Sequence, residues 1–69
     1  MAQNTPPKWT GDLIGRMHNA NVDRTDIAAY MGVTKSYITA ILNGRRTPPE
    51  AKERLNAAFA EIVAKRDTV

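Results

Sequence analysis

Cysteine is absent from this chain, and histidine occurs only once. Without cysteine there can be no disulfide and no thiolate zinc site, and a single histidine cannot assemble a metal cage by itself. Aromatic residues make up only 6 % of the 69 residues, so aliphatic side chains must fill most of the core. We therefore expect no metal and no cofactor, and a single small domain held together by its apolar core alone.

Long apolar runs are also absent. No run approaches the roughly 18 residues needed to span a bilayer, and residues 1–7 lack the apolar stretch of a signal peptide. We therefore expect no membrane partner, and residence in the cytosol of a cell without a nuclear import step. The formal charge of +3 favours polyanionic partners, although such a charge is common among unrelated small domains.

Catalytic constellations are missing as well. The sequence contains no paired carboxylates near a base, no serine and histidine at a credible spacing, and no glycine loop of the kind that holds phosphates. A chain of this length also has little room for a substrate pocket. We therefore predict that the protein is not an enzyme.

Helix signals follow one another along the chain, whereas the alternation typical of strands does not occur. Thr10, Asp23 and Thr34 can each cap a helix, and Thr47-Pro48-Pro49-Glu50 combines a cap, a proline and a capping-box glutamate. The sequence therefore predicts an all-α fold with helices at about 11–19, 24–31, 35–43 and 48–65. It also predicts a flexible N-terminal arm at 1–9, a domain at 10–66 and a tail at 67–69.

The second and third expected helices form a helix-turn-helix. Gly32 suits the sharp turn between them, since glycine readily adopts the left-handed conformation, and Ala28 lies where the two helices cross. Two short helices joined in this way form the unit that reads double-stranded DNA in the major groove. The unit predicts sequence-specific DNA binding, with helix 35–43 as the reading helix.

The reading helix has one apolar and one polar side. At about 100° per residue, Ile38, Ile41 and Leu42 share the core side, and Ser36, Ala40 and Asn43 point away from it. No acidic side chain interrupts this outer strip. The candidate base-reading residues are Lys35, Ser36, Tyr37, Thr39 and Ala40. Two other interpretations of Tyr37 stay open: its ring packs on the edge of the domain and only its hydroxyl contacts a phosphate, or its role is purely structural.

Phosphate contacts should flank this strip, because backbone contacts set the register while base contacts choose the sequence. The candidates lie at the start of the second helix, at the cap of the third and in the turn after it: Arg24, Thr34, Asn43, Gly44, Arg45 and Arg46. For three of these residues, interpretations without a role in DNA binding stay open. Arg45-Arg46 could be a solvated basic loop, and Arg24 an ordinary exposed residue of a first helical turn.

Residues Asp26 to Thr39, DIAAYMGVTKSYIT, and Ile41 to Pro48, ILNGRRTP, closely resemble the lambda-repressor-like (Cro/C1, or XRE) helix-turn-helix family. The resemblance covers about Leu13 to Leu55. It implies a phage or bacterial transcriptional repressor in the cytoplasm of a prokaryotic cell, associated with the nucleoid when bound to DNA. The sequence departs from the family's pattern in two places that bear on dimerisation: the loop before Val22 is shorter, and one long helix after Pro48 replaces two shorter ones.

Helix 48–65 also suggests an oligomer. Its later apolar residues, Phe59, Ile62 and Val63, extend beyond what three short helices can cover, so we expect them to form a homodimer contact. A dimer would read a pseudo-palindromic operator. An alternative is an antitoxin or anti-repressor subunit that uses the same fold to bind a protein; an acidic or apolar outer face on the reading helix would favour it, and the sequence shows neither.

Overall fold

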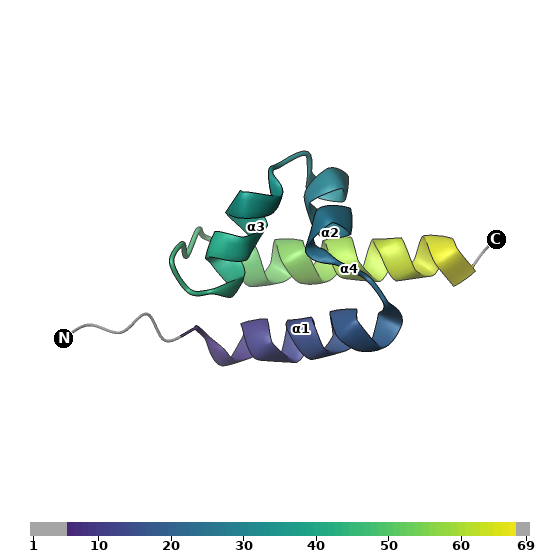
Figure 1. Cartoon of the computed structure of the whole chain (residues 1–69), viewed down its shortest axis with the longest axis horizontal. Coiled ribbons are helices and arrows are strands. Elements are labelled where there is room, and N and C mark those ends of the chain that lie inside the picture. The colour runs from purple at the N-terminus through teal and green to yellow at the C-terminus, as the bar shows by residue number, and fades with distance from the viewer. Residues whose placement is uncertain (1–5, 68–69) are drawn as a thin grey trace.

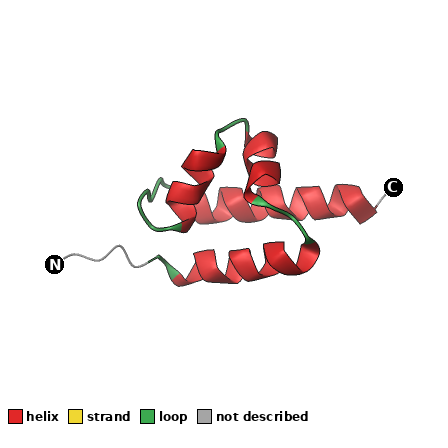
Figure 2. Ribbon diagram, viewed as in Figure 1, coloured by secondary structure: helices red, strands yellow, loops and turns green. Residues whose placement is uncertain are grey.

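The computed structural model describes residues 6–67, and in that range it contains four helices and no strand (Figures 1 and 2). The helices are α1 (Lys8–Ala20), α2 (Arg24–Met31), α3 (Lys35–Leu42) and α4 (Ala51–Asp67). The predicted all-α, four-helix fold is confirmed. Most of the predicted arm and tail, at 1–5 and 68–69, lies outside the described residues, so the division into arm, domain and tail stays a prediction.

The two long helices, α1 and α4, run in the same direction and pack against each other, while α2 and α3 form a corner beside them (Figure 1). α2 packs on both α3 and α4, and α1 also contacts α3. Every helix therefore contributes to one apolar core. The buried core side chains are Leu13, Met17, Val22, Ile27, Ala28, Ile38, Ile41, Leu42, Ala51, Leu55 and Ala58.

The predicted helix-turn-helix caps are present. The Asp23 carboxylate accepts a hydrogen bond from the Asp26 amide at 3.0 Å, and the Asp26 carboxylate accepts one from the Asp23 amide at 3.1 Å. At α3, the Thr34 hydroxyl accepts from the Tyr37 amide at 3.1 Å. Gly32 ends α2 in the left-handed conformation with φ 73°. These local interactions fix both ends of the turn that orients α3.

Two glycine-to-alanine substitutions should have opposite effects. Gly32→Ala places a side chain at positive φ and should lower the free energy of unfolding by roughly 1–2 kcal/mol. Gly15→Ala lies in the exposed interior of α1, with open space around the new methyl group, and should raise the free energy of unfolding by about 0.5–1 kcal/mol. Urea unfolding of both variants checks this, and a stabilising Gly32→Ala would contradict the conformational argument.

α1 begins before the predicted residue 11, and the expectation that Thr10 caps it is wrong. Thr10 lies inside the first turn and is buried, and its hydroxyl donates to the Pro7 carbonyl at 2.7 Å. Pro7 can precede the helix because a backbone N–H at a helix start has no acceptor within the helix, so a proline there loses no hydrogen bond. Burial of Thr10 and partial burial of Trp9 against the core favour the longer helix.

α4 begins after the predicted residue 48, and the predicted cap at Thr47 is also wrong. Pro49 disfavours the helical conformation at Pro48, because its ring clashes with the preceding residue. The chain instead makes a turn, in which the Ala51 amide donates to the Pro48 carbonyl at 3.2 Å and Glu50 has φ 64°. The helix therefore starts only at Ala51.

Arg66 joins the C-terminal end of α4 to the junction between α1 and α2. Its guanidinium donates to the carbonyls of Ala20 at 2.9 Å and Asn21 at 3.0 Å, and it lies 3.5 Å from the Asp26 carboxylate. The carbonyls at the end of a helix lack partners within the helix, so a cation is favourable there. Nearer the start of α4, Arg16 of α1 donates to the Asn56 side chain.

Candidate nucleic-acid interface

α3 presents its polar side outward, as the helical spacing predicts. Ile38, Ile41 and Leu42 are buried on the core side, with at most 2 % of each residue exposed. On the opposite side, Ser36 and Asn43 are exposed and Ala40 is half-buried. The uncharged outer strip is therefore open to a ligand along the helix.

Six of the predicted DNA-contacting residues line one shallow surface hollow, which we call the basic hollow. These residues are Lys35, Ser36, Thr39, Ala40, Asn43 and Arg45. The lining contains two cations and no carboxylate, so a phosphate-lined groove can approach it without like-charge repulsion. The structure thus brings candidate base-reading side chains together with two candidate phosphate contacts.

Arg24 extends the basic hollow toward the start of α2. Its guanidinium donates to the Thr39 hydroxyl at 3.3 Å and so bridges α2 and α3. Arg24 and Lys35 also line an adjoining hollow, so the two cations lie on one side of α3. Arg24 is the first residue of α2, and its side chain is half-buried. This bond spans fifteen residues of sequence, and no local pattern indicated it.

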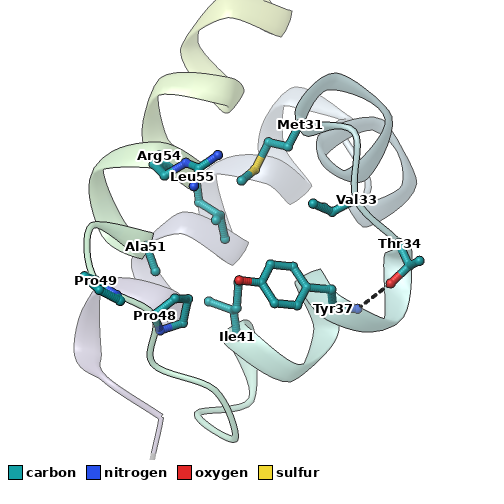
Figure 3. Close-up of a pocket in the computed structure, with 10 residues that line it drawn as sticks. All are labelled: Met31, Val33, Thr34, Tyr37, Ile41, Pro48, Pro49, Ala51, Arg54 and Leu55. Carbon is teal, nitrogen blue, oxygen red and sulfur yellow. Dashed lines mark hydrogen bonds between the residues drawn. The ribbon is translucent and has the colours of Figure 1, made fainter.

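Tyr37 does not line the basic hollow. Its ring points into a separate apolar groove between α3 and the start of α4 (Figure 3), which Thr34 also lines. The Arg46 guanidinium lies 5.6 Å from the centre of the Tyr37 ring, a distance typical of a cation–π contact. This geometry favours the structural interpretation of Tyr37, with the ring positioning Arg46 at the edge of the reading helix.

The turn after α3 uses its amide groups internally. The Gly44 amide donates to the Ile41 carbonyl at 3.1 Å, and the Arg45 and Arg46 amides both donate to the Ala40 carbonyl, at 2.9 and 3.2 Å. Gly44 has φ 80°, so it allows the reversal after α3. The amide of Gly44, a candidate phosphate contact, therefore has an acceptor within the turn. The side chains of Asn43, Arg45 and Arg46 are exposed.

Thr34 retains a donor although it caps α3. Its oxygen accepts the Tyr37 amide, and the hydroxyl proton remains able to donate to a phosphate oxygen. The side chain is exposed. The free amides of the first turn of α3 lie beside it and add a partial positive charge.

These elements make up a helix-turn-helix whose second helix shows a polar, acid-free side. A family model described as helix-turn-helix matches residues 16–52, just over half of the chain, and this range contains every predicted contact residue. The chain belongs to the lambda-repressor-like (XRE) helix-turn-helix family and is a sequence-specific DNA-binding regulator of that type. Searches among curated proteins and among solved structures found no match.

None of the helices in residues 6–67 has the length and apolar character needed to cross a bilayer.

Proposed function

We propose that the protein is a transcriptional repressor of the phage or bacterial type, which binds a pseudo-palindromic operator as a homodimer. The observation that supports this most is the basic hollow, where the outer side of α3 meets Lys35 and Arg45 without an intervening acid. In this arrangement base edges are read by Lys35, Ser36, Thr39 and Ala40, while phosphates are contacted by Arg24, Thr34, Asn43, Arg45 and Arg46. The antitoxin alternative would be favoured by an acidic or an apolar outer surface on α3, and the outer surface of α3 is neither.

Footprinting on DNA fragments from the source genome at two salt concentrations tests this proposal. Neutralising three or four phosphates per domain predicts a slope of log affinity against log salt of about −3 to −4, doubled for a dimer. A protected site with two-fold symmetry is expected from a dimer, whose reading helices lie about one DNA turn apart. A slope near zero would contradict the assignment.

Two single substitutions should separate anchoring from reading. Arg46→Ala should weaken binding to all sequences alike and reduce the salt slope by about one, because it removes one phosphate contact. Lys35→Ala should change the preference among sites, because a lysine at the start of the reading helix favours guanine acceptors. Competition binding with a panel of operator variants measures both. The reverse pattern would show that the anchoring and reading residues are interchanged.

The homodimer is proposed to form through α4. Phe59, Ile62 and Val63 pack against the core but stay half-buried, so part of each apolar side chain remains accessible to a second copy. Ile62→Asp should therefore lower the mass seen by sedimentation from dimer to monomer. Ala57→Asp, at an exposed position of the same helix, is the control for the added charge. Equal masses for Ile62→Asp and the unmodified protein would remove this contact from the proposal.

A further inference from the structure

A second concave surface lies beside the DNA-reading helix. The apolar groove has a volume of about 380 Å³ and is bounded by the end of α2, by α3, by the loop before α4 and by the first turns of α4 (Figure 3). Its apolar lining includes the half-buried Met31, Val33 and Pro48, with the buried Ile41 and Leu55 beneath them. This volume falls at the lower end of the range of sites that bind small molecules.

Three polar side chains line this groove: Thr34, Tyr37 and Arg54. Arg54 is the only charged residue in its lining, and within residues 6–66 no carboxylate pairs with its guanidinium. The Tyr37 ring lies in the groove, with its hydroxyl on the side of Pro48 and Ala51 (Figure 3). An apolar cavity with one unpaired cation is complementary in charge to a ligand that has an apolar body and one negative group.

We propose that the apolar groove binds a small amphipathic carboxylic acid. Its apolar body packs against Met31, Val33 and Pro48, over the buried Ile41 and Leu55, and its carboxylate pairs with Arg54. The groove contains no acidic side chain that would repel such a ligand. Its volume of about 380 Å³ limits the occupant to a compact molecule.

Such a ligand would also act on DNA binding, a step that rests on the function proposed above. Tyr37 lines the groove, and the Arg46 guanidinium lies over its ring. A ligand that moves the ring therefore moves a cation at the edge of the reading helix. The groove and the DNA interface are coupled through this pair of side chains and through Thr34, which lines the groove and is a proposed phosphate contact, so binding at one site changes the affinity at the other.

Titration of the full chain with 3-phenylpropionate, followed by two-dimensional NMR, tests the site without DNA. Saturable shifts are expected at Val33, Ile41 and Leu55. The neutral probe 3-phenylpropanamide has the same body and should bind about fivefold more weakly, the upper range for an accessible ion pair. Arg54→Gln should remove this difference, whereas Lys52→Gln, which removes a charge on the same helix outside the groove, should retain it.

The outcomes separate the site from its coupling. No saturable shift at millimolar probe, or an equal loss of affinity in Arg54→Gln and Lys52→Gln, would overturn the site whether or not the protein binds DNA. If the shifts saturate as expected, the affinity for a footprinted operator is measured with and without the probe. A changed affinity supports the coupling, and an unchanged one overturns it while the site stands.

Discussion

Ser36→Glu should abolish specific DNA binding while leaving the domain folded. The substitution places a carboxylate in the basic hollow, where Lys35 and Arg45 face the expected position of the duplex. It removes a contact at the base edge and adds repulsion from phosphates, which together correspond to a loss of about 100-fold to 1000-fold in affinity. Gel-shift titration on a footprinted operator measures the loss.

The same substitution should not unfold the protein, and this makes the result interpretable. Ser36 is exposed in the first turn of α3, and an acidic side chain near a helix N-terminus interacts favourably with the helix dipole. Ala57→Glu makes the same change in net charge at an exposed position of α4 and should retain most of the affinity. Equal losses in the two variants would show that overall charge, and not the basic hollow, governs binding.

Ile38→Ala should cost most of the stability of the domain. Ile38 is fully buried on the core side of α3, and truncating a buried isoleucine to alanine typically lowers the free energy of unfolding by about 2–5 kcal/mol. A domain of this size has only a few kcal/mol of net stability, about 3–5 kcal/mol from a single core. The variant should therefore be largely unfolded at physiological temperature, as measured by circular dichroism during urea titration.

Ile38→Val provides the graded control. It removes one methyl group and should cost about 0.5–1.5 kcal/mol, so the protein stays folded and binds DNA. If Ile38→Ala remained as stable as Ile38→Val, the side chain would not be packed as the structure shows it. Comparison with Ser36→Glu then separates loss of DNA binding through unfolding from loss through a changed surface.

The helix-turn-helix was predictable from the sequence because its boundaries depend on local interactions. Asp23 and Thr34 accept hydrogen bonds from the backbone amides three residues later. Gly32 adopts the left-handed backbone conformation that the turn requires. Each of these signals lies within one turn of the residue it affects. The core side of α3 was predictable for a similar reason, since Ile38, Ile41 and Leu42 follow the helical period.

The first residues of α1 and α4 were predicted less well, because several local signals compete where these helices begin. Thr47 has the side chain of a cap, but the steric effect of Pro49 on Pro48 prevents the helix from starting beside it. At α1 the burial of Thr10 against the rest of the chain outweighs its preference for a capping position. Tertiary packing decides such cases, and it is not visible in a short stretch of sequence.

The candidate interface was also predictable only in part. The outer strip of α3 and the basic residues after it were predictable from spacing and charge. The bond between Arg24 and Thr39 was not, because it joins side chains of different helices. The helical angle places Tyr37 on a flank of α3 but does not decide its role, because the apolar groove that receives the ring is lined by residues of both α3 and α4.

The contacts of Arg66 have a consequence for how the molecule opens. One side chain in the last turns of α4 holds the end of α1 and the first turn of α2, yet it is largely exposed to solvent, so its hydrogen bonds exchange readily with water. Fraying of the last turn of α4 releases this junction first and leaves the buried centre around Leu13 and Ile38 intact. Amide protons near Asn21 should therefore exchange with deuterium well before those of the reading helix.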